Sequence, residues 1–389
     1  MSGSRPRPAQ AAGASSPAGA RGAHGGARVP DVSVVVAVYN TMPYLTRCLE
    51  SLVAQTIGHR RMEVLVVDDG STDGGSKEIA RFATRYPYLF TVVRQPNSGG
   101  PAAPSNRGLA LARGRYVFFL GADDHLAPQA LERMVERADA WESDVLLCKM
   151  AAAGERTVPE GVFRASAPAI RLLGDGLPWA LSNTKLFRRS LIEEHRIRYD
   201  ETMPAFSDQP FVLEACVRAR RISVLAEQEL YYAVRRKDSG NITFRACPET
   251  RLACAERLFD SVCRLLEPGP LRDGFHRRHF HVELYQLFGP DFARLSPQVR
   301  ERVCAGAARL IGAHGDGVLE ELDEHRRRVL ELAWRGEVEA LCAHPADRPG
   351  GRPEREPGRS ALVRWLLAPV GRGLPAGGED PWAGRLRRR

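Results

Sequence analysis

Residues 32–39 read VSVVVAVY, a nearly continuous run of apolar, mostly β-branched side chains. A strand that is buried on both faces has this composition, because neither of its faces needs polar side chains for water. Such strands belong to parallel sheets that are covered by helices on both sides. The stretch therefore predicts a buried strand of a parallel α/β sheet.

The residues that follow alternate between helix and strand patterns. Further apolar runs predict strands at 62–69, 90–95, 115–122 and 143–150. Apolar residues recur at helical spacing in the segments between them, at 43–56, 74–86, 105–114 and 127–141. This alternation predicts a doubly wound, mostly parallel sheet, which binds its ligands at the carboxyl ends of the strands.

Composition divides the chain into four parts. Residues 1–30 are rich in Ala, Gly, Pro and Ser and have no apolar stretch typical of a secretory signal, so we expect a disordered arm. Residues 31–245 are predicted to form the α/β domain, and residues 246–350 a helical region. Residues 351–389 are predicted to be a basic, flexible tail. No run of about 18 apolar residues predicts a membrane-spanning helix.

The net charge of +9 comes from the two ends of the chain. Residues 1–30 carry four Arg and no acid, and residues 351–389 carry nine Arg and four acids. A middle part without net charge argues against nucleic acid as a partner. The tails either keep the protein soluble, which we favour, or contact an anionic membrane surface. Eight scattered Cys without a CxxC pair are typical of reduced thiols, which predicts a cytoplasmic protein, with peripheral contact to the cell membrane as the open alternative.

Pairs of acids follow two of the predicted strands. Asp68 and Asp69 end the strand at 62–69, and Asp123 and Asp124 follow the strand at 115–122. Adjacent carboxylates repel each other unless a cation or hydrogen-bond donors satisfy them. Mn²⁺ or Mg²⁺ binds carboxylate oxygens and commonly substrate phosphates as well. The pattern predicts a divalent ion and a nucleoside diphosphate at this edge of the sheet.

Structural alternatives stand beside these interpretations. A turn and helix cap explains residues 71–73 well and Asp68 and Asp69 less well, and a cap on the helix near residue 127 is the alternative for Asp124. Tyr39 either stacks on a flat ring or fills the core. Asn97 and Asn106 either hydrogen-bond a ligand or belong to a plain turn.

Two further features have a functional and a structural interpretation. His276, His279 and His281 resemble a metal cluster, but no Cys or acid pattern completes it, and a solvent-exposed helix face is the preferred interpretation. Trp179 either stacks on a sugar or packs in the core.

Four stretches, in this order and spacing, resemble family 2 glycosyltransferases of the GT-A fold. They are VSVVVAVYN from residue 32, VLVVDDGSTDGG from residue 64, QPNSGGPAAPSNRGLALARGRYVFFLGADD from residue 95, and FSDQPFVLEACVRARRI from residue 206. The resemblance covers about residues 31–245. The SGGP and SDQ stretches are most similar to enzymes that glycosylate wall teichoic acid or related bacterial surface polymers.

The resemblance implies roles for the residues on the donor side. By position, Ala37 and Tyr39 line the pocket for uracil and ribose, and Asp69 accepts a hydrogen bond from the uracil ring N–H. Asn97 helps to hold the nucleotide. The stretch RRKDSGNIT, residues 235–243, resembles the family's segment that can close over the diphosphate, which makes Arg235, Arg236 and Ser239 weaker candidates for contacting it.

The resemblance also implies the residues of the reaction centre. Asp123 takes the place of the last acid of the DxD motif, beside Ala122, and meets the diphosphate and its metal. Asp124 is the second candidate metal ligand. Asp208 takes the place of the catalytic base, and a helix N-cap is a compatible structural role for it.

The function implied is inverting transfer of a sugar from a UDP-sugar to a hydroxyl of a bacterial surface polysaccharide or teichoic-acid-like polymer, assisted by Mn²⁺ or Mg²⁺. The helical region at 246–350 then positions the acceptor or forms an oligomer contact. Two departures from the family pattern are Gly121, where the DxD motif usually begins with an acid, and Ser105, where an Arg is common. They slightly favour the alternative of a decayed, nucleotide-binding scaffold. A sugar-phosphate nucleotidyltransferase is the other alternative, but the loop after residue 39 lacks the glycine-rich basic pattern that it needs.

Overall fold

The computed structural model describes residues 29–153, 158–236, 246–343 and 346. Its main sheet has seven strands in the order β3-β2-β1-β4-β8-β6-β9. Their bounds are β1 Val32–Val38, β2 Met62–Asp68, β3 Phe90–Arg94, β4 Tyr116–Phe119, β6 Val145–Cys148, β8 Lys185–Arg188 and β9 Ile222–Leu225. Strand β8 runs antiparallel to its neighbours β4 and β6, and the other neighbouring pairs are parallel. The predicted doubly wound, mostly parallel sheet is confirmed.

A second, three-stranded sheet lies beside the carboxyl end of β4. It has the order β5-β10-β7, with bounds β5 His125–Leu126, β7 Met150–Ala153 and β10 Tyr231–Val234. Strand β10 is antiparallel to β5 and parallel to β7. The sequence predicted one strand at 143–150, whereas the chain passes there from β6 in the main sheet to β7 in the small one. This change of sheet brings β10 next to the acids that follow β4.

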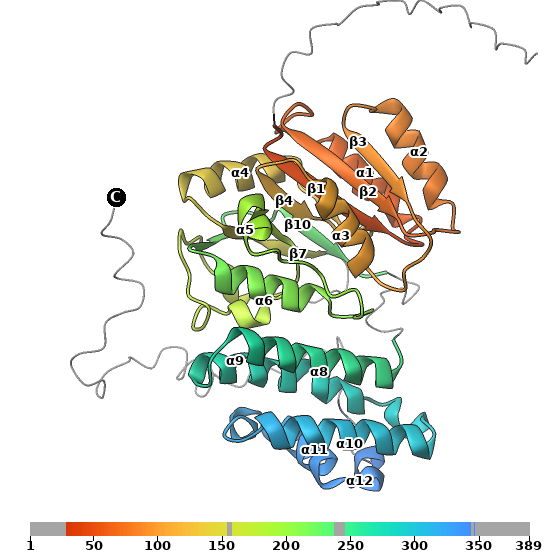
Figure 1. Ribbon diagram of the computed structural model, residues 1–389, viewed down its shortest axis with the longest axis vertical. Coiled ribbons are helices and arrows are strands. Elements are labelled where there is room, and N and C mark those ends of the chain that lie inside the picture. The colour runs from red at the N-terminus through yellow and green to blue at the C-terminus, as the bar shows by residue number, and fades with distance from the viewer. Residues whose placement is uncertain (1–28, 154–157, 237–245, 344–345, 347–389) are drawn as a thin grey trace, which may run out of the picture.

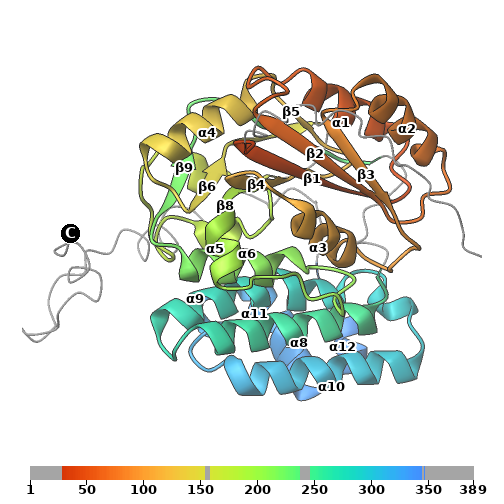
Figure 2. The ribbon, with the colours of Figure 1, turned by 45° about the horizontal axis from the view of Figure 1, so that its top comes forward.

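Helices cover both faces of the main sheet, as Figure 2 shows. One face carries α1 (Tyr44–Val53), α2 (Gly75–Arg85) and α4 (Ala130–Ala140). The other face carries α3 (Ala102–Leu111), α5 (Arg189–Glu194) and α6 (Asp208–Arg218). Helix α1 buries Leu45, Cys48, Leu49 and Leu52, which is the face that its apolar spacing predicts. Helix α3 begins three residues earlier than expected, directly after Pro101.

The carboxyl-terminal helices form two further layers below α6 (Figure 1). The first layer holds α8 (Pro248–Leu265) and α9 (Pro270–His279), and the next holds α10 (Pro297–His314), α11 (Glu324–Arg335) and α12 (Val338–Ala343). A π-helical turn, Phe280–Leu284, continues α9. Short 3-10 turns cover Gly161–Phe163, Leu177–Trp179, Tyr285–Phe288, Phe292–Arg294 and Leu319–Glu321.

The sheet and the helical layers each have their own apolar core. A small buried cluster joins them and consists of Met203 and Ala205, before α6, and Cys254 and Leu258, on α8. None of the helices in the described part of the chain has the length and apolar content to cross a membrane. The predicted arm and basic tail lie almost entirely outside the described residues, as does Ser239.

Candidate active site at the carboxyl edge of the sheet

The loops that follow β1 and β2 are hydrogen-bonded to each other at the carboxyl edge of the sheet. The Asn40 backbone N–H donates to Ser71 Oγ at 3.2 Å, and Asn40 Oδ1 accepts from the Thr72 N–H at 2.8 Å. The Met42 N–H donates to Asp73 Oδ2 at 2.7 Å. These bonds fix the shape of the edge, so residues 71–73 hold the neighbouring loop, whereas Gly74 occupies the N-cap position of α2 without a side-chain cap.

Three predicted donor-site residues meet at the end of β1. The Tyr39 side chain is 43% exposed, so the alternative that it fills the core is wrong. Ala37 lies two residues earlier on the strand and is half-buried. The Arg236 guanidinium reaches this edge from the segment after β10: it donates to the Asn40 carbonyl at 2.7 Å and lies 5.9 Å from the centre of the Tyr44 ring. An exposed ring and a cation therefore flank the end of this strand.

Asp68 supports the turn after β2 rather than facing solvent. Its side chain is buried, and Oδ1 accepts from the Ser71 N–H at 2.9 Å while Oδ2 accepts from Ser76 Oγ at 2.5 Å. The Arg94 guanidinium lies 3.6 Å from Oδ2. Asp68 therefore has a structural role in holding this turn, which the sequence analysis preferred only for residues 71–73.

Asp69 is held by the loop that follows β3. Its buried carboxylate accepts from Gln95 Nε2 at 2.7 Å, from Ser98 Oγ at 2.9 Å and N–H at 3.0 Å, and from Asn97 Nδ2 at 3.3 Å. Asp69 and Asn97, which the sequence placed in one pocket, are thus brought into direct contact. Both carboxylate oxygens are oriented by protein donors.

Asn106 connects two parts of the protein. Its Oδ1 accepts from the Tyr199 N–H at 2.9 Å, and its Nδ2 donates to the Tyr199 carbonyl at 2.9 Å. The neighbouring Ser105 is only 4% exposed, so this position is filled by a small buried side chain. Asn106 thus links α3 to the segment that precedes α6.

Asp124 ties the turn after β4 to β10. Its side chain is 3% exposed, with Oδ2 accepting from the Tyr231 hydroxyl at 2.5 Å and Oδ1 from the Val234 N–H at 2.7 Å. Helix α4 begins only at Ala130, after Gln129, so the alternative that Asp124 caps it is wrong. Asp123 beside it is half-buried, and Ala122 is buried.

We expect Gly121→Asp, which adds the acid common in the family, to destabilise the protein. A Cβ here would lie 2.7 Å from Asp124 Oδ2 and 3.2 Å from both Asp123 Oδ1 and the Tyr231 hydroxyl. Overpacking costs about 1–3 kcal/mol, and a third carboxylate adds repulsion. Thermal unfolding in a chelating buffer measures the loss, with Gly161→Asp, which has open space around it, as the control. Equal stability of the two variants would contradict the expectation.

An open cleft of about 670 Å³ lies between α1, the turn after β4 and the end of β10. Asp123 lines it, together with Tyr44, Arg47 and His125. The His125 ring stacks on Tyr232, with ring centres 4.9 Å apart, and burial, reinforced by Arg47, lowers the pKa of His125. Sequence reasoning missed Arg47, because it lies within a helix that was assigned by its apolar face and no local pattern marks its place in the cleft.

Asp208 is the first residue of α6 and is half-buried. Ser207 before it occupies the N-cap position and its side chain forms no cap hydrogen bond, so the N-cap role predicted for Asp208 is wrong. Among the described residues, no other side chain hydrogen-bonds its carboxylate. Loss of hydration raises the pKa of Asp208, and the negative charge of Glu283 acts in the same direction, while Lys185 and Arg278 oppose the rise. The structure thus gives this carboxyl a more basic character than an ordinary Asp has.

Lys185 is a buried cation near Asp208 that sequence reasoning missed. It is 2% exposed, and its Nζ donates to the carbonyls of Ala180 at 2.6 Å and Ser182 at 2.5 Å. Burial lowers the pKa of Lys185 to about 8, although the nearby Asp208 favours its charged form. Lys185 begins the strand β8, whose next two residues are apolar, and nothing in this local sequence indicated a buried cation near Asp208.

A buried polar network joins α6 to the helical layers. Gln209, next to Asp208, donates from Nε2 to Glu283 Oε1 at 2.8 Å and accepts at Oε1 from Arg278 at 2.8 Å. Arg278 also forms a close ion pair with Glu283, and His279 Nδ1 lies 3.1 Å from the same carboxylate. Burial alone would raise the pKa of Glu283, but Arg278 and the bonds from His279 and Gln209 lower it to about 2. The π-helical turn therefore presents a charged carboxylate to the residue beside Asp208.

The three histidines of 276–281 do not form one site. His276 and His279 are buried, so the preferred interpretation of a solvent-exposed helix face is wrong for them. His279 belongs to the network with Glu283, and the His281 ring packs edge-on against Trp179, with ring centres 4.8 Å apart. The contact of Trp179 with His281 agrees with a packing role for Trp179.

Comparison with known proteins agrees with this geometry. Residues 33–196 match Glycosyl transferase family 2, and residues 248–344 match the Glycosyl transferase TarS linker domain. Asp208 and Arg236 lie between these two matches. The crystal structure of Staphylococcus aureus TarS 1-349 in complex with UDP-GlcNAc superimposes with a TM-score of 0.70 at 28% identity, over 80% of this chain and 89% of that one.

Two curated relatives are poly(ribitol-phosphate) glycosyltransferases. The β-glucosyltransferase of Bacillus spizizenii is 32% identical over 59% of this chain and 36% of its own length. The β-N-acetylglucosaminyltransferase TarS of Staphylococcus aureus is 35% identical over 56% of this chain and 38% of its own length. The match thus spans little more than a third of each relative.

Proposed function

Residues 33–196 belong to glycosyl transferase family 2 and residues 248–344 to the TarS linker domain, and on this premise we propose that the protein is an inverting glycosyltransferase. It transfers a sugar from a UDP-sugar to a hydroxyl of a bacterial cell-surface polymer of the poly(ribitol phosphate) type. The kinds of reaction named for its relatives support this acceptor class. The observation that carries the proposal is the half-buried Asp208 carboxylate, whose pKa is raised, at the start of α6.

The donor nucleotide binds at the end of β1 and β2 in this proposal. The exposed ring of Tyr39 offers a face for stacking, and Ala37 leaves room beside it. Asp69 accepts from the uracil N–H, which takes the place of one of the donors from the loop that now surround the carboxylate, and Asn97 stays beside it. Arg236, held at the Asn40 carbonyl, contributes positive charge for the diphosphate.

After β4, the protein offers one carboxylate as a ligand for a divalent ion such as Mn²⁺ or Mg²⁺. Asp123 is half-buried and lines the cleft, whereas both oxygens of Asp124 accept bonds from β10, and Gly121 has no side chain to offer. Asp123 would therefore hold the ion, with Asp124 fixing the turn and contributing a ligand only if β10 shifts. Such ions complete their oxygen shell with substrate phosphates and water, and when bound act as Lewis acids toward a leaving diphosphate.

Asp208 acts as the general base. Its carboxylate accepts the proton of the acceptor hydroxyl as that oxygen attacks the anomeric carbon and the bond to UDP breaks, which inverts the configuration. A base with a pKa raised by desolvation takes up this proton more readily than an ordinary Asp. The positive charges of Lys185 and Arg278 oppose this rise in the pKa of Asp208.

We propose that this reaction takes place in the cytoplasm. The eight cysteines form no disulfide in the described structure, which agrees with a reducing compartment.

Calorimetric titration of UDP, with and without Mn²⁺, tests the donor site first. We expect Mn²⁺ to strengthen binding to the wild type and Asp123→Ala to weaken the metal-dependent binding by about 10- to 100-fold, since a charged contact contributes about 1.5–3 kcal/mol. Asp291→Ala removes an exposed carboxylate in the helical layers and serves as the control.

Turnover with UDP-GlcNAc and UDP-glucose, using a poly(ribitol phosphate) acceptor, completes the test. UDP binding without transfer to any polymer hydroxyl would support the decayed scaffold instead. Release of pyrophosphate from UTP and a sugar phosphate would identify a nucleotidyltransferase. Absence of UDP binding under every condition would reject the donor site.

A further inference from the structure

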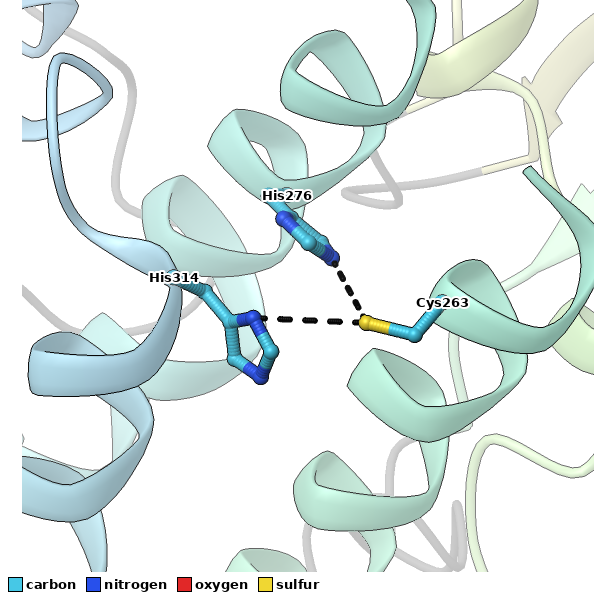
Figure 3. A group of neighbouring side chains, drawn as sticks. All are labelled: Cys263, His276 and His314. Carbon is cyan, nitrogen blue, oxygen red and sulfur yellow. Dashed lines mark hydrogen bonds between the residues drawn. The ribbon is translucent and has the colours of Figure 1, made fainter. Parts of the chain in front are cut away.

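Three potential metal ligands from three helices meet in the carboxyl-terminal layers. Cys263 lies on α8, His276 on α9 and His314 at the end of α10, and Figure 3 shows their side chains pointing toward one another. The Cys263 sulfur is 3.8 Å from His276 Nε2 and 4.0 Å from His314 Nδ1. One ligand atom from each residue lies within 4.8 Å of the other two.

The three side chains are covered on one side by the Phe259 ring and are partly exposed to solvent on the other. The Phe259 ring stacks on His314, at 5.2 Å between ring centres, and tilts against His276 at the same distance. His276 is 3% exposed, whereas Cys263 and His314 are half-buried. An ion here would be bounded by an aromatic wall and would remain accessible to one water molecule.

We propose that Cys263, His276 and His314 bind a single Zn²⁺ ion, with water as the fourth ligand, and that this ion holds α8, α9 and α10 together. One thiolate and two imidazoles are the ligands that Zn²⁺ prefers, whereas Mg²⁺ and Mn²⁺ prefer oxygen. The site is therefore distinct in chemistry and position from the acids after β4. It goes beyond the transferase activity, because it concerns the stability of the helical layers.

The two sulfur–nitrogen distances require only a small closure, whereas the two imidazole nitrogens, which lie within 4.8 Å of each other, must approach to about 3.4 Å. Tetrahedral Zn²⁺, with a Zn–S bond of about 2.3 Å and Zn–N bonds of about 2.0–2.1 Å, places the sulfur about 3.5 Å from each nitrogen. The sulfur–nitrogen distances of 3.8 and 4.0 Å must therefore shorten by a few tenths of an ångström.

The positively charged side chain of Arg272 lies beside the Cys263 sulfur. Its guanidinium donates to Cys263 Sγ at 2.5 Å from the first turn of α9. Zinc binds Cys263 as the thiolate, and the thiol proton is released when the ion binds. Because Arg272 is half-buried, it can turn toward solvent when the ion takes its place at the sulfur.

The test uses the full chain, without an affinity tag, freed of metal with a chelator and titrated with Co²⁺ and then Zn²⁺. We expect one Co²⁺ per chain to give a thiolate-to-metal charge-transfer band and the visible bands of a tetrahedral site, both removed by Zn²⁺. Cys263→Ser should abolish the charge-transfer band and weaken Zn²⁺ binding at least about 100-fold, and His314→Gln should weaken it similarly, since even the outer partners of zinc ligands contribute 10- to 100-fold.

Matched variants separate this site from other thiols, imidazoles and acids. Cys247→Ser and His59→Gln alter exposed residues elsewhere and should keep the band, as should Asp123→Ala. Zinc should raise the unfolding temperature of the wild type and not that of Cys263→Ser, while UDP binding by Cys263→Ser reports that it has folded. A wild type without the band, or a Cys263→Ser that binds Zn²⁺ as tightly as the wild type, would overturn the proposal.

Discussion

Asp208→Asn is expected to lower the rate of sugar transfer by about 10²- to 10⁴-fold while leaving UDP binding unchanged, because it removes only the proton acceptor. The substitution keeps the shape of the side chain at the start of α6. Steady-state transfer and UDP calorimetry on the same preparation measure the two effects. Glu214→Gln, which removes a half-buried carboxylate on the same helix, is the matched control.

The raised pKa of Asp208 also predicts the direction in which Asp208→Asn changes the stability of the fold. An acid whose pKa is higher in the folded protein than in the unfolded chain destabilises the fold at pH values above both, because the charged form is less well accommodated there. The neutral Asn variant should therefore unfold at a higher temperature than the wild type at pH 7. Transfer by the wild type should decline as acid protonates Asp208. A variant that retains full activity would remove Asp208 from the mechanism.

Glu283→Gln is expected to have the largest effect on stability, because it leaves Arg278 as an uncompensated charge at a site where Arg278 and Glu283 are 12% and 1% exposed. Removing one partner of a buried ion pair costs about 3–5 kcal/mol. Urea unfolding measures the loss. Glu331→Gln, on α11, removes a half-buried carboxylate that lies 3.8 Å from Arg327 and Arg335, and should cost less than about 1 kcal/mol.

The same substitution tests whether the helical layers position the proposed base. Gln209 bonds to Glu283 and directly follows Asp208, so transfer per folded molecule should fall in Glu283→Gln, with UDP affinity retained. Because the pKa of Glu283 is lowered to about 2 from its ordinary 4.5, its contribution to stability should be present above about pH 4.5 and fade as the pH falls toward 2. Reduced stability with unchanged transfer would mean that the network supports only the fold.

The strands of the main sheet and the helices up to residue 148 could be predicted because their patterns are local. A run such as VSVVVAVY has no polar face, so it can be stable only inside a sheet that is covered on both sides. The contact of Asp69 with Asn97 was also accessible, since the carboxyl ends of neighbouring parallel strands meet at one edge. The separate roles of the adjacent acids could not be predicted, because Asp68 and Asp69 point to opposite sides of the chain and contact different partners.

The sequence by itself determined the type of sheet, its edge of strand-ending acids and the helical character of the carboxyl-terminal region, because periodicity and strand-end composition act over a few residues. Only the tertiary structure decided which acids face the cleft, which side chains surround Asp208 and which histidine meets Cys263. Those partners lie on separate elements: Tyr231 reaches Asp124 across 107 residues, and His314 reaches Cys263 across 51. Such contacts depend on how helices and sheets pack, and packing is set by the shape of the whole core rather than by any local pattern.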